Sequence, residues 1–315
     1  MARSAPISST AVADVAHARA SQKPHRRSRL ESLARWSFLL PVLLLNLLVI
    51  GLPSIIGILY SFTEWSGYGD PVFVGLANFE RLFQDGTFYK ALLNNLVWTG
   101  IFLTIPVALG LLGAYLLSGI KRGQMFFRVA YFIPYVIASV VNAQLWRFLL
   151  HPRHGIGALL ANYGITFLDF PVLGTRETAL YGVALVDGWH FWGFLVVIYL
   201  AAMSQVDVEL YEVARLDGAT RLQQFRYVTL PSIRPTLVFT LLMIIIWSSL
   251  VFDYIFILTG GGPAHASEVM ATYLYDNAFF RFDVGYAASI GVMMSLWVGL
   301  AVAGFVILRR RGWEI

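Results

Sequence analysis

Six long apolar runs, separated by shorter polar segments, dominate the hydropathy pattern of this 315-residue chain. Each run is long enough to cross a bilayer, which takes about 20 residues of helix. The pattern predicts membrane spans at residues 36–60, 92–117, 129–150, 178–203, 236–258 and 285–308. Prolines inside three of these runs indicate kinked helices, because neighbouring helices or water can satisfy the carbonyl that a proline frees. We therefore predict an all-α membrane protein with six transmembrane helices.

The polar segments divide the chain further. Residues 1–33 are rich in Ala, Ser and Arg without apolar periodicity, which predicts a disordered, basic tail that is retained in the cytoplasm. The first helix and an outer loop follow at 34–91. A five-helix core occupies 92–308, with a polar loop at 204–235, and residues 309–315 form a second cytoplasmic tail.

Composition agrees with a membrane protein. Hydrophobic residues make up 58% of the chain and charged residues 13%, whereas a soluble domain has about 25% charged residues. The chain has no cysteine, so disulfides and thiolate metal sites are excluded, and we expect neither a metal nor a cofactor. It also lacks the Gly-x-x-x-x-Gly-Lys-Ser/Thr pattern that cradles phosphates, so any ATP-driven work requires a partner.

The basic residues set the orientation. Most of the 23 Lys and Arg residues lie in the N-terminal tail, in the 204–235 loop and in the other segments on the same side. The positive-inside rule then places both termini and this loop in the cytoplasm, with the chain crossing the membrane several times. The same rule explains the net charge of +5 without a nucleic-acid partner.

Local signals predict a compact, two-helix knob in the 204–235 loop. Residues 208–216 form a helix pattern with Asp207 as N-cap, and Gly218 can turn the chain with positive φ. Thr220 and Gln223 fit a capping box that starts a second short helix toward Tyr227. Without further information, such a segment could be an ordinary solvated loop.

The same loop resembles a known pattern. Glu212-x-Ala214-x-x-Asp217-Gly218-Ala219, followed by Leu230-Pro231, resembles the coupling loop of binding-protein-dependent ABC importer permeases, although Val213 stands where Ala is usual. The segment from Phe252 to Pro263, which ends in Leu-Thr-Gly-Gly-Gly-Pro, resembles the maltose-type, carbohydrate branch. The resemblance covers roughly residues 35–310, and it implies the inner (plasma) membrane of a prokaryotic cell.

The resemblance implies that the knob docks into a cleft of an ATPase subunit. Glu212 and Gly218 would be the docking residues, and Ala214, Asp217 and Ala219 would shape the surface. It also implies four kinds of partner: a second homologous permease subunit, two ATPase subunits, an extracytoplasmic solute-binding protein and a sugar solute.

A solute path needs polar or aromatic groups at membrane depth. Asp187 and His190 share a face of the fourth run, at i and i+3, with Trp189 and Trp192 beside them. In the fifth run the candidates are Trp247, Ser248, Ser249 and Asp253. Carboxylates accept hydroxyl protons and aromatic rings stack on sugars, which suits a sugar path, and the resemblance implies sugar contacts in these two spans. Leu250 and Val251 stand where the resemblance implies an amide in the sugar-contacting subunit, which favours the sister subunit for more of the sugar contact.

Each of these residues also has a structural interpretation, as an interhelical bond, a core histidine or an interface aromatic. We predict a permease subunit for a sugar or oligosaccharide, in which partner subunits hydrolyse ATP. The alternatives are a glycerol phosphate, a polyol or another polar solute in the same architecture, an ATP-independent secondary transporter, or an intramembrane enzyme. The enzyme is disfavoured because no nucleophile or metal-ligand set accompanies Asp187 and His190.

Overall fold

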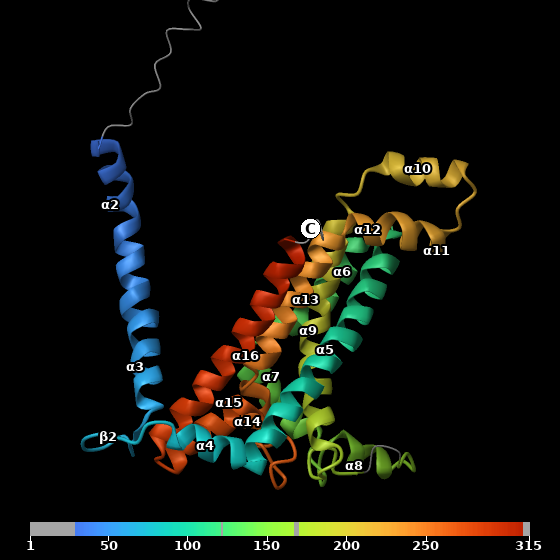
Figure 1. Ribbon diagram of the computed structural model, residues 1–315. Helices are drawn as coiled ribbons and strands as arrows, with labels where there is room; N and C mark the ends of the chain where they lie inside the picture. The colour runs from blue at the N-terminus through green and yellow to red at the C-terminus, as the bar shows by residue number, and fades with distance from the viewer. Residues whose placement is uncertain (1–28, 121, 167–169, 311–315) are drawn as a thin grey trace, which may run out of the picture. The chain divides into compact units, whose positions relative to one another are not determined.

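The structure is a computed structural model that describes residues 29–120, 122–166 and 170–310. The chain divides into a first unit that ends at Ile56 and a second that begins at Gly57. The first unit holds α2 (Arg29–Asn46), the π-helical turn η1 (Leu47–Gly51) and the start of α3 (Leu52–Tyr60) (Figure 1). Residues 29–33, assigned to the tail by the sequence, are therefore helical. The rest of that tail, up to residue 28, and residues 311–315 lie outside the described residues.

Four helices run side by side as the body of the second unit (Figure 1). They are α5 (Gly86–Ser118), α9 (Ala179–Met203), α13 (Arg234–Ser249) and α16 (Val284–Arg310). One end of the bundle carries α10 (Val208–Leu216), α11 (Arg221–Gln224), η2 (Phe225–Thr229) and α12 (Leu230–Ser232). The other end carries β1 (Thr63–Glu64), β2 (Val72–Phe73), α4 (Ala77–Gln84), α8 (Ile156–Ala161), α14 (Asp253–Leu258), α15 (Met270–Tyr275) and η3 (Asp276–Phe280).

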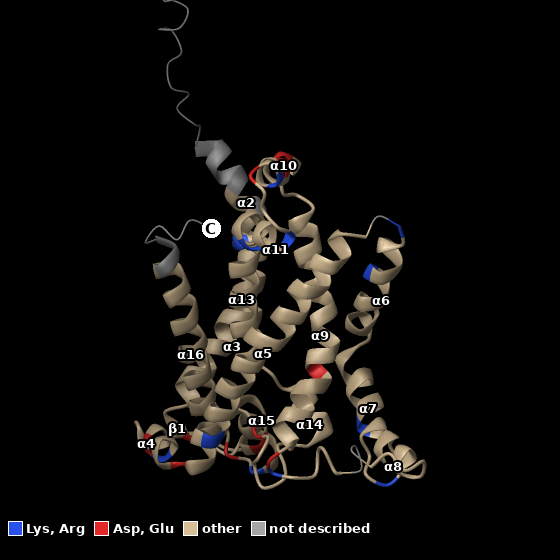
Figure 2. Cartoon of the chain, turned by 90° about the vertical axis from the view of Figure 1, so that its right-hand side faces the viewer, with Lys and Arg blue, Asp and Glu red and all other residues tan. Residues whose placement is uncertain are grey.

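Charge follows the same division. Figure 2 shows Lys, Arg, Asp and Glu of the second unit gathered at its two ends, with little charge along the helices between them. The final turn of α16 lies at the same end as α10 and α11. A bundle with an apolar middle and charged ends fits a bilayer, because charge is costly within the hydrocarbon.

The helices α5, α6 (Gln124–Val136) and α9 make the tightest seam of the bundle. At Gly193 of α9, a Cβ would overlap the backbone carbonyl of Tyr131 in α6, so only glycine allows this approach. On the opposite flank, a Cβ at Gly110 of α5 would lie 2.6 Å from the Cβ of Leu195. Small residues at helix contacts are typical of membrane bundles, in which close packing replaces the hydrophobic driving force.

The six predicted spans are confirmed in number when broken spans are counted once. Among the described residues, four stretches are long and apolar enough to cross a membrane alone: Leu39–Tyr60, Gly86–Ser118, Ala179–Met203 and Val284–Ile307. Two more stretches qualify only as bent pairs: Gln124–Val136 with Ser139–Leu149, at 91°, and Arg221–Ser232 with Arg234–Ser249, at 70°. In the second pair the polar loop supplies Arg221–Ser232, so the apolar part of that span is α13. The chain is thus a helical membrane protein. The small antiparallel ribbon of β1 and β2, which pairs Glu64 with Val72, was not predicted.

The third predicted span, 129–150, is wrong as one helix. It starts earlier, in α6, and breaks at residues 137–138 before α7 (Ser139–Leu149). Ile137 is extended, with ψ of 130°, and its carbonyl pairs with Nε2 of His190 at 3.1 Å. A side chain from another span thus satisfies the backbone group that the break exposes.

The fifth predicted span, 236–258, is also wrong as one helix. It leaves helical structure at 250–252, between α13 and α14. Asn95 of α5 donates its amide to the carbonyl of Ser248 at 2.8 Å, and Trp297 of α16 donates its indole N–H to Oγ of Ser249 at 3.1 Å. Hydrogen bonds from neighbouring spans again stabilise the break. The residues at the break are apolar, so the sequence reads as one continuous run.

The second predicted span begins at Gly86 rather than at residue 92. Asp85 caps this longer helix, because its carboxylate accepts the amide of Thr87 at 2.8 Å.

Candidate functional site

The polar loop folds as its capping residues predict. Asp207 accepts the amide of Glu209 at 3.1 Å and starts α10. Gly218 turns the chain with φ of 79°. Thr220 and Gln223 form the predicted capping box, in which the Thr220 amide donates to Oε1 of Gln223 at 2.7 Å. The knob of two short helices is therefore confirmed, and its second half continues beyond Tyr227 to Ser232.

The knob presents both charge and apolar surface. Glu212, Asp217 and Gly218 are exposed, Ala214 and Ala219 are half-buried, and Pro231 and Leu230 lie in α12 at the base. Apolar side chains beside them are also exposed to solvent, and Leu216 is 89% exposed. The hydroxyl groups of Tyr211 and Thr229 bond at 2.9 Å and tie α10 to η2. A fixed knob with exposed apolar groups has the character of a docking surface.

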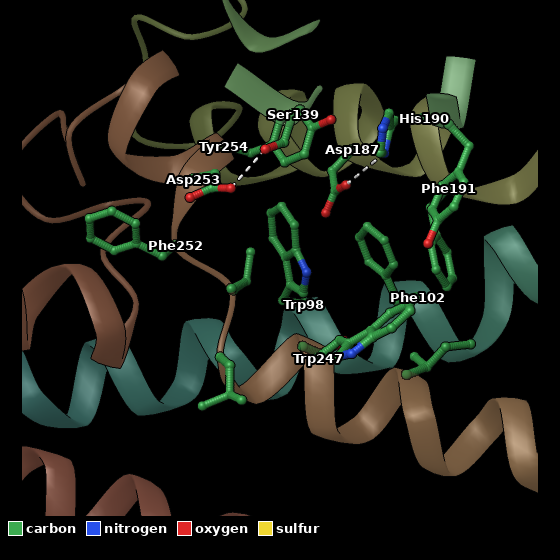
Figure 3. A pocket seen from close by; sticks show the side chains of 15 residues that line it. Trp98, Phe102, Ser139, Asp187, His190, Phe191, Trp247, Phe252, Asp253 and Tyr254 are labelled. Atoms are coloured by element: carbon green, nitrogen blue, oxygen red, sulfur yellow. Dashed lines mark hydrogen bonds and ion pairs between the residues drawn. The ribbon is translucent and has the colours of Figure 1, made fainter. Parts of the chain in front are cut away.

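A cavity of about 450 Å³ lies within the bundle. Both helix breaks border it, since Ser139, the first residue of α7, and residues 250–253 line its wall. Figure 3 shows Asp187 and His190 of α9 facing Asp253 and Tyr254 of α14 across this space. Non-helical backbone at membrane depth is tolerated where it lines a cavity, so the breaks and the cavity belong to one arrangement.

Asp187 is the least satisfied polar group of the cavity. No hydrogen bond from any described residue reaches its carboxylate, and its closest ionic contact is Nδ1 of His190, 3.9 Å away. A carbonyl only accepts, so the contact with Ile137 requires the hydrogen of a neutral His190 on Nε2. Nδ1 then offers a lone pair toward Asp187 instead of a proton. The carboxylate, whose side chain is 17% exposed, keeps its acceptor capacity for water or a solute.

Asp253 is held from the opposite wall. Ser139 donates its hydroxyl to Oδ2 of Asp253 at 2.8 Å, and Asn142 of α7 donates to the Tyr254 hydroxyl at 2.9 Å. These two bonds link α7 to α14, so the segments that follow the two breaks support one another. Among the described residues, no group of three or more His, Asp or Glu side chains could hold a metal ion.

The structure brings together five of the eight predicted path residues. Asp187, His190, Trp247, Ser248 and Asp253 line the cavity, whereas Trp189, Trp192 and Ser249 do not. Trp189 packs edge-on against Trp146, with ring centres 5.4 Å apart, and Trp192 packs against Tyr131 at 5.0 Å. Ser249 bonds to α16 instead. For these three residues the structure favours the packing interpretation.

Sequence reasoning missed much of the remaining wall. Trp98 and Phe102 of α5 stack at 5.1 Å and face the cavity, and Ser139 and Phe191 complete its polar and aromatic lining (Figure 3). Trp98 and Phe102 stand at i and i+4, a spacing that predicts a shared helix face but does not say what that face meets.

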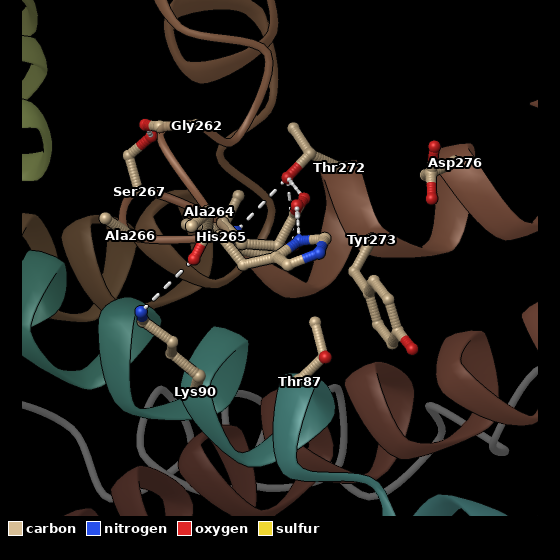
Figure 4. A network of polar contacts seen from close by, with 12 residues as sticks. Thr87, Lys90, Gly262, Ala264, His265, Ala266, Ser267, Thr272, Tyr273 and Asp276 are labelled. Carbon is tan, nitrogen blue, oxygen red and sulfur yellow. Dashed lines mark hydrogen bonds and ion pairs between the residues drawn. The ribbon is translucent and has the colours of Figure 1, made fainter. Parts of the chain in front are cut away.

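The Gly-Gly-Gly-Pro turn near Pro263 encloses a separate acidic group (Figure 4). The Glu268 side chain is 5% exposed. It accepts the Thr272 hydroxyl at 2.5 Å and contacts Nδ1 of His265 at 2.9 Å. Gly261, with φ of 84°, covers it closely, because a Cβ there would come within 2.8 Å of Oε1. The turn is thus shaped around a fully bonded carboxylate.

A comparison with known proteins then decides the family. No family model matches the chain. It is 36% identical over 261 residues to the probable ABC transporter permease protein YurN of Bacillus subtilis, an alignment that covers 82% of this chain and 89% of the relative. The chain belongs to the ABC transporter permease family. As a permease, it has up to six spans among its described residues, and the helix breaks at 137–138 and 250–252 border its cavity.

Two further similarities agree. The permease is 30% identical over 266 residues to the multiple sugar-binding transport system permease protein MsmF of Streptococcus mutans, covering 84% of this chain and 91% of the relative. Its fold matches a chain in the crystal structure of a bacterial ABC transporter involved in the import of the acidic polysaccharide alginate. That match has a TM-score of 0.80 and 25% identity, and covers 91% of this permease and 100% of that chain.

Proposed function

We propose that this chain is a transmembrane subunit of an ATP-driven, binding-protein-dependent importer for a sugar or oligosaccharide. Its cavity is the solute path, and its knob of α10–α12 couples that path to ATPase subunits. Partner subunits hydrolyse the ATP, since the chain has no phosphate-cradling loop. The proposed partners are a second homologous permease, two ATPase subunits and an extracytoplasmic binding protein.

One observation carries the assignment of the path: a carboxylate without a hydrogen bond from the described residues, Asp187, faces a cavity between two broken spans. A carboxylate left unpaired in lipid would cost several kcal/mol, so it faces water or solute. Trp247, Phe191 and Trp98 supply flat apolar surface on the same wall. Carboxylates that accept hydroxyl protons beside aromatic faces suit a saccharide.

The relatives supply the solute class. MsmF is named as part of a multiple sugar-binding transport system, and the structural neighbour belongs to an importer of alginate. Their names favour a saccharide for this permease, and the wall chemistry agrees with that class.

Purification of the tagged full-length chain from its native membrane in a mild detergent tests the proposal. We expect ATPase subunits and a second permease in the complex, and ATP hydrolysis that rises when the sugar-loaded binding protein is added. Recovery of the permease without any ATPase subunit, after cross-linking in the membrane, would contradict the proposal and favour a secondary transporter or an enzyme.

The coupling role has its own test. Glu212→Lys should abolish sugar-stimulated ATP hydrolysis while the protein still inserts, because Glu212 is exposed on the knob. Replacing Gly218 with a bulky residue should have the same effect. Glu209→Lys, also exposed on α10, is the matched control, since it makes the same charge change at a position outside the motif. Equal activity of the Glu212 and Glu209 variants would remove the coupling assignment.

We also propose that both termini and the knob are cytoplasmic. In support, α16 runs toward the end of the bundle that carries α10 and α11 (Figure 1), and basic residues favour that side. A reporter fused after Arg310 should be active only in a cytoplasmic assay, and a reporter near Ala266 only in an extracytoplasmic one.

A further inference from the structure

The cavity between the broken spans carries an unbalanced charge. Its described lining contains two carboxylates, Asp187 and Asp253, one imidazole, His190, and two phenols, Tyr135 and Tyr254, but neither Lys nor Arg. These groups come from α6, α9 and α14, while α5, α7 and α13 contribute only uncharged side chains. With both carboxylates ionised and the imidazole neutral, the side chains give the cavity two negative charges.

Neither carboxylate is neutralised by an ion pair with a permanent cation. Among the described residues, the one charged-group contact of either carboxylate is the 3.9 Å approach of His190 to Asp187. Nε2 of that imidazole is engaged by the Ile137 carbonyl, so the neutral ring turns a lone pair toward Asp187. Asp253 accepts a hydrogen bond from Ser139, but a hydroxyl is an uncharged donor and leaves the carboxylate charge in place.

Helix ends offset this charge only in part. Ser139 begins α7, whose N-terminus carries about half a positive charge. That end of α7 bonds to Asp253, and Asp253 itself begins α14, so both helix ends offset the charge of Asp253. Asp187 lies in the interior of α9, eight residues after its first residue. Asp187 is therefore the group that fixes the sign of the cavity.

We propose that Asp187 and Asp253 make the cavity a charge filter, which admits neutral and positively charged saccharides and excludes saccharides that carry carboxylate or phosphate groups. Asp187 is its main specificity-determining residue. Sugar hydroxyls and ammonium groups can donate to both carboxylates, whereas an anionic group would meet like charge without a Lys or Arg partner. That the solute is a saccharide rests on the proposed function, but the charge preference of the cavity does not.

The absence of native cysteine permits a direct test with single-cysteine variants of the full-length permease. Val251→Cys places a thiol in the cavity wall. Tyr163→Cys places one on the loop after α8, at a side chain that is 84% exposed and has no charged residue within five positions. Each is treated with methanethiosulfonate reagents that are cationic, neutral or anionic and of similar size.

We expect the ratio of cationic to anionic modification rates at Val251→Cys to exceed that at Tyr163→Cys by about tenfold or more. The comparison of two sites cancels the intrinsic reactivity of the reagents. Asp187→Asn combined with Asp253→Asn should bring the Val251→Cys ratio down to the control value. Asp187→Asn alone should remove more of the difference than Asp253→Asn alone. Equal ratios at the two sites in the unsubstituted background would overturn the proposal.

A second measurement needs no carboxylate variant, and so remains decisive if these variants fail to assemble. Salt should reduce the Val251→Cys ratio, since the screening length falls from about 30 Å at 0.01 M to about 3 Å at 1 M. A ratio that salt leaves unchanged would contradict a filter based on charge. Sugar uptake by the complete importer tests the proposed function separately. Uptake without a difference between cationic and anionic modification would contradict only the charge filter. Such a difference without sugar uptake would contradict only the importer function.

Discussion

Two acidic side chains, Asp187 and Glu268, are largely withdrawn from water in this permease, yet their surroundings differ. Glu268 accepts a hydroxyl, contacts an imidazole and lies beneath the backbone of a glycine turn. Asp187 has no hydrogen bond from the described residues and faces an open cavity. A buried acid whose acceptors are filled holds structure together, whereas one whose acceptors are free destabilises the fold and persists for a ligand. Bonding therefore separates the two roles better than burial does.

The largest expected effect on stability comes from Glu268→Ala. The change removes the acceptor of Thr272 and the partner of His265, and we expect a loss of about 3 kcal/mol, because hydrogen bonds to a charged group are worth about 1.5–3 kcal/mol each. The apparent melting temperature of the purified permease measures it. Glu268→Gln is the control, since it keeps an acceptor oxygen and should cost less. An unchanged melting temperature in Glu268→Ala would contradict the claim that Glu268, unlike Asp187, stabilises the fold.

Gly261→Ala should come next. The new methyl group would meet the Glu268 carboxylate and would also force a side chain into positive φ. Gly218→Ala is a matched control, because Gly218 has nearly the same φ, 79°, but nothing within 4 Å of the added atom. Backbone strain alone costs about 1–2 kcal/mol, so we expect Gly261→Ala to lower the melting temperature clearly further than Gly218→Ala. Equal decreases in melting temperature for the two variants would mean that the turn accommodates the methyl group without displacing the Glu268 carboxylate.

A third carboxylate, Asp85, extends the comparison to pH. Burial alone would raise the pKa of Asp85, but donation from Tyr273, from Tyr286 at 2.5 Å and from the Thr87 amide holds it below its ordinary value of 3.8. Since the folded-state pKa is lowered, its stabilisation is complete well above 3.8 and is lost as pH falls through the folded-state value. Melting temperatures should therefore fall on acidification below about pH 4, and less steeply in Asp85→Asn. Parallel profiles would rule out this contribution.

Asp187→Asn should have the smallest effect on stability. The substitution removes a charge that no described group bonds, so the melting temperature should stay the same or rise slightly. Uptake of sugar by the assembled importer should nevertheless weaken, or its preference among sugars should change. A loss of assembly with selectivity unchanged in the surviving complex would make Asp187 an interhelical bond, and its contrast with Glu268 would disappear.

The sequence predicted the features that depend on residues a few positions apart in the chain. The residue types of Asp207 and Thr220 predicted that they cap helices, and the spacing of Asp187 and His190 placed both on one face of a helix. It could not predict the breaks, because residues 137–138 and 250–252 contain neither glycine nor proline and are stabilised by His190 and Asn95 from distant spans. Trp189 and Trp192 were assigned to the path because they lie beside Asp187 and His190 in the sequence. Since α9 is apolar around most of its circumference, no pattern showed which of its faces meets the cavity.

The seam at Gly193 has a mechanical consequence. Where the backbones of α6 and α9 meet at Gly193, the two helices cannot slide past one another without a clash, so we expect them to move with α5 as one rigid body. The hydrogen bonds of Ser139 with Asp253 and of Asn142 with Tyr254 join α7 to α14 as a second body. We therefore expect the two breaks to act as hinges, 137–138 between α6 and α7 and 250–252 between α13 and α14. Because Asp187 belongs to the first and Asp253 to the second, we expect the distance between their carboxylates to report how far the permease has opened.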